Sequence, residues 1–318
     1  MRAVVIREFG PPSVLEPAEA VEVRPGPDEV VIDVEVANIT FVETQIRAGR
    51  PPHPSMRPAL PAILGNGVGG TVRGGTVRGG GRRVVASLNG TGGYAERAVA
   101  AAARLIEIPD ELTTRNAVAL LADGRTALAV AGRAELRAGD TVLIEAAGGG
   151  VGTLLVQIAR NAGARVVALA GHPRKLALAR DLGADLTVDY RSDGWERQVR
   201  DATGQVDVVF DGVGGDIGRA AFGLLGGGGR FCPFGMASGS FTPVSPEQAK
   251  AWGVSVRSGT GVSPEEQAAL TRTALAQAAA GRLRPVIGQE FGLDEAAAAH
   301  AAIEARETIG KTLLTVSG

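Results

Sequence analysis

The chain has 318 residues, a formal net charge of −1, one cysteine and 46 glycines, and glycine is thus about twice its usual share of roughly 7%. Glycine does not recur at every third position and 45% of the residues are hydrophobic, which excludes collagen and disorder and predicts a fold long enough for two domains. One cysteine excludes an intramolecular disulfide and any multi-cysteine metal site, and the near-zero charge gives no electrostatic reason to expect nucleic-acid binding. No apolar stretch approaches a membrane span and the first residues do not resemble a signal peptide, so we expect a cytoplasmic protein with no membrane partner.

The first hundred residues predict short strands that are separated by proline and glycine. These strands are expected at Val30–Val36, Gly69–Arg73, Thr76–Arg78 and Arg83–Leu88. The sequence Gly-Thr-Val-Arg-Gly occurs at 70–74 and again at 75–79. Because glycine adopts the positive φ of tight turns, this repeat predicts a hairpin that turns at Gly74-Gly75.

From about residue 116 the pattern changes to helices that alternate with strands. After a helix at Asn116–Ala134, strands are expected at Thr141–Ala147, Arg165–Ala170, Leu186–Val188, Val206–Asp211 and Gly229–Phe234. The intervening helices are expected at Val151–Ala162, Pro173–Leu182, Gly194–Ala202 and Ile217–Leu225. This alternation predicts an α/β fold with a doubly wound parallel sheet. The tail predicts helices at Pro264–Ala280 and Leu293–Glu304 with strand-like pieces around the second.

The most informative motif is Ala147-x-Gly149-x-x-Gly152, which follows an apolar strand and opens an apolar helix. Its spacing is that of a dinucleotide fingerprint with alanine in the first place. Gly149 would let the backbone approach a pyrophosphate, Gly152 would let helix and strand pack closely, and the helix N-terminus at Gly150 and Val151 would offer N–H groups to the phosphates. The alternative interpretation is a tight turn with a structural role only.

The end of the second strand of this unit indicates which dinucleotide is bound. It reads Ala170-Gly171-His172, without the Asp or Glu that binds the ribose hydroxyls in NAD sites. Arg174 and Lys175 follow at the helix start, where two cations attract a 2′-phosphate. The segment therefore predicts NADP(H), with an ordinary solvated helix start as the alternative. His172 is either a neighbour of the phosphate or simply exposed.

Further segments occur in the order typical of one enzyme family. They are Met1–Val5 with Phe9–Pro12, Ile39–Gly49, Tyr94-Ala95-Glu96, Ala146–Gly152, Val188-Asp189-Tyr190-Arg191, Phe234-Gly235 with Ser238-Gly239, and Thr308-Ile309-Gly310-Lys311. Together they resemble the zinc-free, zeta-crystallin-like quinone oxidoreductase branch of the medium-chain dehydrogenases/reductases. The resemblance extends over the whole chain.

The resemblance implies a Rossmann domain inserted into a GroES-like β-barrel domain. The barrel would contain residues 1–118 and the returning segment 263–318, and the NADP-binding domain residues 119–262. The implied activity is zinc-independent hydride transfer from NADPH to a small-molecule quinone or activated enone. Members of the family are commonly homodimers, and here the edge strand would be Gly253–Arg257.

The resemblance also implies roles for residues outside the fingerprint. Tyr190 would join Lys175 and Gly171 at the 2′-phosphate end of the cofactor. The cofactor-binding set is completed by three residues along the nicotinamide and one in the segment Asp123-Gly124-Arg125-Thr126-Ala127, namely Phe234, Gly235, Met236 and Thr126. Asp123 would lie near the nicotinamide, where it holds substrate or cofactor, or else it caps the following helix.

The chain departs from the zinc-containing relatives at the metal-ligand positions. Thr40 stands in place of their Cys, and Asn66-Gly67 in place of their His-Glu, so no zinc site is expected. Thr40 is either a hydroxyl donor to the substrate carbonyl or a barrel residue satisfied by backbone. Cys232 lies in an apolar strand and is expected in the core.

Two further functions remain open at this stage. A redox-idle NADPH-binding protein, acting as a sensor or a structural partner, would bind the cofactor without turnover. An enoyl-thioester reductase would need an acid of its own, and the two tyrosines, Tyr94 and Tyr190, match other family positions.

Overall fold

The computed structural model describes residues 1–75, 81–259 and 263–316, which belong to two units. One unit comprises Met1–Gly124 and Gln267–Gly318, and the other is the continuous segment Arg125–Glu266. Helix α2 (Thr114–Ala134) contains the first division and α8 (Pro264–Ala279) the second. The fold is therefore an α/β unit inserted into a β-rich one, as the sequence predicts.

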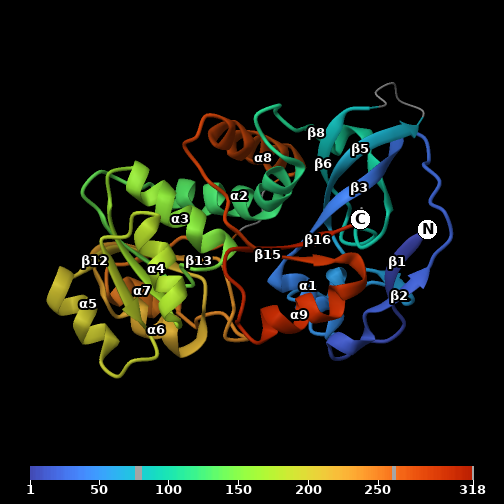
Figure 1. Cartoon of the computed structure of the whole chain (residues 1–318). Coiled ribbons are helices and arrows are strands. Elements are labelled where there is room, and N and C mark those ends of the chain that lie inside the picture. The colour runs from blue at the N-terminus through green and yellow to red at the C-terminus, as the bar shows by residue number, and fades with distance from the viewer. Residues whose placement is uncertain (76–80, 260–262, 317–318) are drawn as a thin grey trace. The chain divides into compact units, whose positions relative to one another are not determined.

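The inserted unit is built on a six-stranded parallel sheet in the order β11-β10-β9-β12-β13-β14. Figure 1 shows β12 and β13 of this sheet. This is the doubly wound order, in which the chain first adds strands on one side of β9 and then on the other. The strands are β9 (Thr141–Ile144), β10 (Arg165–Ala170), β11 (Leu186–Asp189), β12 (Val206–Asp211), β13 (Leu225–Pro233) and β14 (Ser255–Val256). The helices are α3 (Gly150–Asn161), α4 (Pro173–Asp181), α5 (Trp195–Thr203), α6 (Gly215–Phe222) and α7 (Pro246–Ala251).

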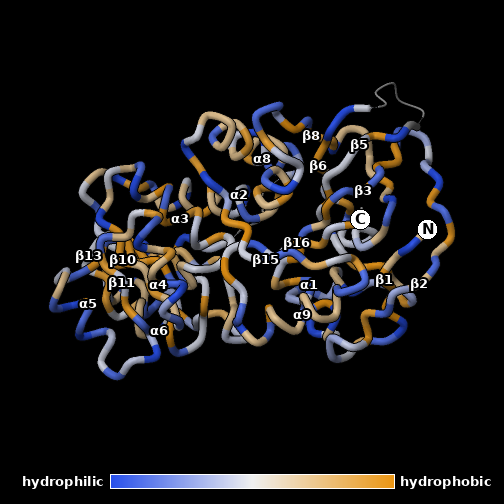
Figure 2. Tube along the Cα trace, viewed as in Figure 1, coloured by the Kyte–Doolittle hydropathy of each residue, from blue (hydrophilic) through white to orange (hydrophobic). Residues whose placement is uncertain are grey.

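Aliphatic side chains hold this sheet to its helices. Leu143, Val167, Leu169 and Val209 are completely buried and belong to one cluster. Figure 2 shows the same division, with hydrophobic colour on the central strands and hydrophilic colour along α5. Burial of each such side chain contributes about 1.5–3 kcal/mol. The sheet therefore forms a firm support for the loops at its ends.

The other unit contains two sheets, of which the larger has the order β15-β16-β3-β5-β6-β8 with β7 also paired to β3. Its strands are β3 (Glu29–Ile39), β5 (Gly67–Gly75), β6 (Arg83–Ser87), β7 (Arg97–Ala101), β8 (Ile106–Glu107), β15 (Ile287–Gly292) and β16 (Lys311–Thr315). The smaller sheet joins β1 (Arg2–Ile6) to β2 (Glu16–Glu19) and β4 (Ala62–Ile63). Helices α1 (Phe41–Arg47) and α9 (Ala296–Glu304) belong to this unit, which has the GroES-like architecture that the resemblance implies.

Three sequence predictions about elements were wrong. Gly74 and Gly75 do not turn but continue β5, paired with Val31 and Val30, and the expected strand at 76–78 lies outside the described residues. The first strand of the inserted unit ends at Ile144, because Ala146 adopts a left-handed φ of 48°. Helix α6 ends at Phe222, and Leu225, expected in that helix, begins β13.

Candidate functional site

The turn after β9 lies where the strand order of the parallel sheet reverses. Residues 145–149 connect β9 to α3, and β12 is the neighbour of β9 on the side of the reversal. Ligands of doubly wound sheets bind beyond the carboxyl ends of the strands at this point. The fold therefore places Ala147 and Gly149–Gly152 where a dinucleotide would be held.

A close contact between the turn and α3 requires glycine at position 152. A methyl group there would put its carbon 2.2 Å from the carbonyl oxygen of Ala146 and 2.8 Å from Cα of Ala147. Gly149 is the N-cap of α3, and its N–H donates to the same Ala146 oxygen at 2.8 Å. The first-turn N–H groups and the positive end of this 12-residue helix are thus offered by backbone alone, which suits a pyrophosphate.

The residues predicted for a 2′-phosphate gather after β10 and β11. His172 is the N-cap of α4, and its Nδ1 accepts the N–H of Arg174 at 3.2 Å. The stem of Lys175 lies over Gly148 of the fingerprint turn, because a methyl group on Gly148 would come within 2.5 Å of Lys175 Cβ. His172 and Arg174 are exposed. The exposed His172 therefore also has a structural role, which the sequence did not reveal.

Tyr190 lies against the turn that follows β10. A methyl group on Gly171 would lie 3.1 Å from the ring and hydroxyl atoms of Tyr190. The preceding residue, Asp189, for which the sequence predicts no role of its own, accepts hydrogen bonds from Arg191 at Nε (3.1 Å) and Nη2 (2.8 Å). This pairing lowers the pKa of Asp189 and offsets its charge near His172. The charge of Asp189 at the end of β11 is therefore balanced by the charge of Arg191.

The segment after β13 rests on the loop after β12. The N–H groups of Phe234 and Gly235 both donate to the carbonyl oxygen of Asp211, at 2.8 and 3.2 Å. Gly235 approaches Gly212 so closely that a methyl group on it would lie 2.5 Å from the Gly212 oxygen. Met236 is partly exposed in the same segment, and Thr126 is partly exposed on α2. Phe234 and Gly235 are thus brought to the strand end next to the fingerprint turn.

Two acidic residues at this strand end were not identified from the sequence. Glu145 follows β9, Asp211 ends β12, and neither side chain is exposed. The signal in the sequence is an acid at the carboxyl end of each of two apolar strands. The pKa of Glu145 is raised well above its ordinary value, first by burial and then by the charge of Asp211.

In the other unit, Thr40 and Glu43 form a capping pair at the start of α1. The Thr40 N–H and hydroxyl both donate to Glu43 Oε2, at 2.5 and 3.1 Å, and Glu43 Oε1 accepts the N–H of Asn66 at 2.7 Å. Glu43 is buried, which raises the pKa of its carboxyl group. One interpretation of the sequence predicted that backbone groups satisfy the Thr40 hydroxyl. The hydroxyl is instead satisfied by the Glu43 side chain.

Asp123 forms a buried ion pair with Lys311. The Lys311 Nζ lies 3.0 Å from Asp123 Oδ1, and the two side chains are 4% and 12% exposed. Asp123 lies inside α2, so the interpretation that it caps a following helix was wrong. Removal of either partner would leave a buried charge uncompensated.

The residues at the zinc-ligand positions of the relatives do not fit a metal ion. Glu43 binds Thr40 and the Asn66 N–H, and Asn66 Oδ1 accepts N–H groups of Leu88 and Gly90 at 3.2 and 2.7 Å. Within residues 1–75, 81–259 and 263–316, no group of three or more His, Cys, Asp or Glu side chains could hold a metal. The side chains of Glu43 and Asn66 are therefore engaged in hydrogen bonds within the protein.

Two groups that could have carried chemistry are buried. Tyr94 is fully buried with its hydroxyl 3.0 Å from His300 Nε2, and burial raises the pKa of Tyr94 well above its ordinary value. Cys232 is buried as expected, which raises the pKa of its thiol to about 12. Neither group is placed to act as a proton donor or nucleophile at neutral pH.

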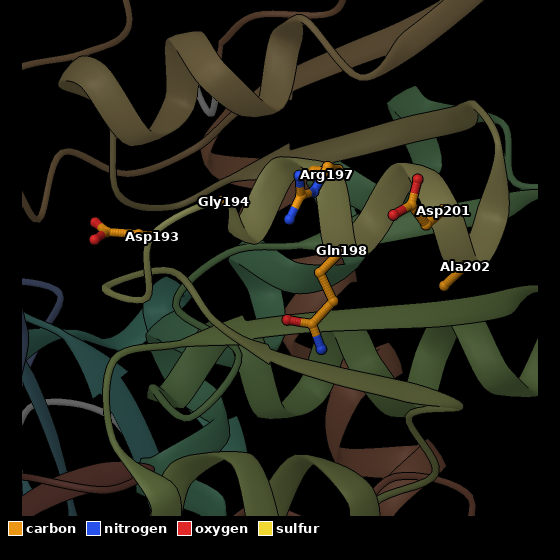
Figure 3. A pocket seen from close by; sticks show the side chains of 6 residues that line it. All are labelled: Asp193, Gly194, Arg197, Gln198, Asp201 and Ala202. Carbon is orange, nitrogen blue, oxygen red and sulfur yellow. The ribbon is translucent and has the colours of Figure 1, made fainter.

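A surface depression along α5 does not qualify as the site. It is lined by Asp193, Gly194, Arg197, Gln198, Asp201 and Ala202. Figure 3 shows that these side chains do not converge on one point. None of them belongs to the strand ends described above. In the part of the chain that the structure describes, no helix is long and apolar enough to cross a membrane.

Comparison with known proteins shows what the chain is similar to. Residues 182–314 match the family described as zinc-binding dehydrogenase. The chain is 32% identical to a quinone oxidoreductase of Pseudomonas aeruginosa, over 96% of this chain and 97% of that protein. It is 30% identical to a 2-haloacrylate reductase of a Burkholderia species, over 99% and 98%. A mycobacterial structure in complex with NADPH is 32% identical and superposes with a TM-score of 0.89, covering 99% of this chain and all of that one.

The contact at Gly152 predicts a loss of stability when a methyl group is added. Gly152→Ala is expected to lower the free energy of unfolding by about 1–3 kcal/mol, because the added carbon overlaps the Ala146 carbonyl. Gly132→Ala on α2 is the control: nothing lies within 4 Å of its added carbon, and it should stabilise by about 0.5 kcal/mol. Both are measured by denaturant unfolding. Equal stability of the Gly152→Ala variant and the unaltered protein would contradict the requirement.

Proposed function

The chain belongs to the quinone oxidoreductase family of medium-chain dehydrogenases/reductases, and from that membership we propose that it is an NADPH-dependent, zinc-independent reductase of a quinone or an activated enone. The observation that carries the proposal is the fingerprint turn at the strand reversal, with Gly152 against the Ala146 carbonyl. Relatives of similar length support the reaction class, since one is named for quinone and another for 2-haloacrylate, an activated alkene.

The residues around the strand ends fit NADPH, which supplies the hydride when it is bound. We assign the pyrophosphate to the N-terminus of α3 at Gly149–Gly152, where backbone N–H groups are offered. We assign the 2′-phosphate end of the cofactor to Arg174 and Lys175, with His172 and Tyr190 beside them. The nicotinamide side falls to Phe234, Gly235, Met236 and Thr126, of which Phe234 and Gly235 are anchored by Asp211.

The proposed substrates need little help from protein groups. A quinone or enone delocalises the charge that develops on its oxygen, so hydrogen bonds can replace a Lewis acid. We keep Thr40 as the candidate donor to that oxygen. To donate there, the Thr40 hydroxyl must give up its hydrogen bond to Glu43 Oε2. Asp123 is the second candidate, as a residue that holds substrate or cofactor, and its pairing with Lys311 fixes its side chain in place.

We further propose that the protein is a homodimer that pairs through β14. This strand is the last in the sheet order, which leaves one side of its backbone for another strand. Trp252 and Val256, just before and within it, are 50% and 37% exposed. Pairing of this edge with its copy would cover apolar surface and close the sheet edge, which natural proteins seldom leave open.

Cofactor preference tests the assignment of the 2′-phosphate. Arg174→Ala combined with Lys175→Ala should weaken NADPH binding by about tenfold or more and NADH binding by less than about twofold, because only NADPH loses charge-assisted hydrogen bonds. Titration calorimetry measures both constants. Arg180→Ala, at the other end of α4, is the control and should leave both unchanged. Equal weakening of the two cofactors would reject the assignment.

Turnover tests the reaction class. With a panel of quinones and activated enones, the protein should oxidise NADPH, followed by the loss of absorbance of the reduced nicotinamide. Binding of NADPH without turnover of any panel member would favour a redox-idle sensor or structural protein. Turnover of crotonyl thioester alone would favour an enoyl-thioester reductase.

Sedimentation tests the dimer. Val256→Asp should convert a dimer to a monomer, because it places charge on the exposed edge of β14 where two copies would meet. Val256→Thr has nearly the same shape and should remain dimeric. A monomer for the unaltered protein would refute the proposal.

A further inference from the structure

Two carboxyl groups lie side by side beneath the proposed cofactor site. Strands β9 and β12 are neighbours with Ile144 opposite Phe210, so Glu145, which follows β9, comes next to Asp211, the last residue of β12. The N–H of Glu145 also donates to the carbonyl oxygen of Phe210 at 3.0 Å. Both side chains are completely buried. Two neighbouring carboxyl groups that are shielded from water cannot both be ionised without a large cost in free energy.

The hydrogen bonds around the pair show which group holds a proton. Asp211 accepts the Gly214 N–H at 2.7 Å and the Thr242 hydroxyl at 2.6 Å, so both its oxygens have donors. Glu145 Oε2 accepts the Val213 N–H at 3.1 Å. Its other oxygen, Oε1, is buried and finds no donor among the described residues. A proton on Oε1 gives this oxygen a partner, because it can then donate to Asp211.

We propose that Glu145 is a positioning residue, held protonated against the Asp211 carboxylate, and that this proton fixes the loop at Gly212–Gly215. The groups that face Glu145 agree with this assignment. The charged side chain that acts on it is Asp211 from β12, and the loop after β12 contributes the N–H groups of Val213 and Gly214. Burial and the Asp211 charge raise the pKa of Glu145, while the N–H groups lower it by less.

The fixed loop in turn supports the segment after β13. Ser238 N–H donates to the Val213 oxygen at 2.8 Å, and Ala237 N–H to the Gly212 oxygen at 3.4 Å. Phe234 and Gly235 donate to Asp211 itself. The pair therefore sets the nicotinamide-side wall, an inference that rests on the proposed function. Loss of the Glu145 proton at high pH would place two negative charges together and loosen this wall.

Infrared spectroscopy tests the proton directly, without any cofactor. At pH 7 the unaltered protein should show the carbonyl stretch of a buried protonated carboxyl group. Glu145→Gln should remove that band, and Glu247→Gln, which alters an exposed glutamate on α7, should leave it. Absence of a band that Glu145→Gln removes would overturn the proposal, since Glu43, a second buried carboxyl group, is unchanged in that variant.

The stability of the protein tests the same proton by its pH dependence. The folded chain would bind one proton more than the unfolded chain above the ordinary glutamate pKa of 4.5, so stability is lost as pH rises towards the raised pKa. Relative to Glu145→Gln, the unfolding constant of the unaltered protein should rise about tenfold per pH unit in that window. Parallel pH profiles of the two proteins would overturn the proposal.

Cofactor affinity tests the link from the pair to the wall. Glu145→Ala should weaken NADPH binding by about fivefold, since the Val213 N–H loses its acceptor. Glu145→Gln should restore the affinity, because an amide can accept from Val213 and donate to Asp211. Equal affinity of Glu145→Ala and the unaltered protein would overturn this link. Failure of all variants to bind NADPH would refute the proposed function, while the infrared band would still decide the protonation.

Discussion

The approach of α3 to the Ala146 carbonyl is the constraint on which the proposed cofactor site depends. No side chain fits between them, so position 152 must be glycine and Ala146 must accept a left-handed φ of 48°. A non-glycine residue in that conformation is held by its surroundings at some cost. The parallel sheet supplies the support, because its central strands are anchored by fully buried aliphatic side chains. Backbone geometry, and not a charged side chain, thus presents the helix N-terminus to a phosphate.

Carboxyl groups of both units are paired with a neighbouring group. Asp189 is matched by Arg191 and Asp123 by Lys311. Glu145 and Asp211 have no cation between them, which is why a proton takes its place. At the start of α4, the exposed Arg174 and the partly exposed Lys175 therefore lie near an acid, Asp189, whose charge Arg191 offsets.

Local patterns were enough for much of the fold. The strands at Arg165–Ala170 and Val206–Asp211 have the bounds that the sequence predicts, because apolar runs between helical segments leave little choice. The boundary at Leu225 was wrong, since a leucine before four glycines suits a helix end or a strand start equally well. The fingerprint was recognisable because its residues are neighbours in the chain. The pairs Glu145–Asp211 and Asp123–Lys311 were not recognisable, because the two partners of each pair are far apart in the chain and their roles depend on burial.

The return of the chain to its first unit bears on the order in which the protein can fold during synthesis. Strand β3 completes its pairing only with β16, where Thr312 lies opposite Ile39, and Asp123 finds its cation 188 residues further on. The inserted unit is continuous in sequence and can close as soon as Glu266 has left the ribosome. The β-rich unit, although its first part is synthesised earlier, must wait for β16 (Lys311–Thr315). Until β16 is made, the Val36–Ile39 part of β3 lacks this partner, so a late segment completes a sheet that an early one begins.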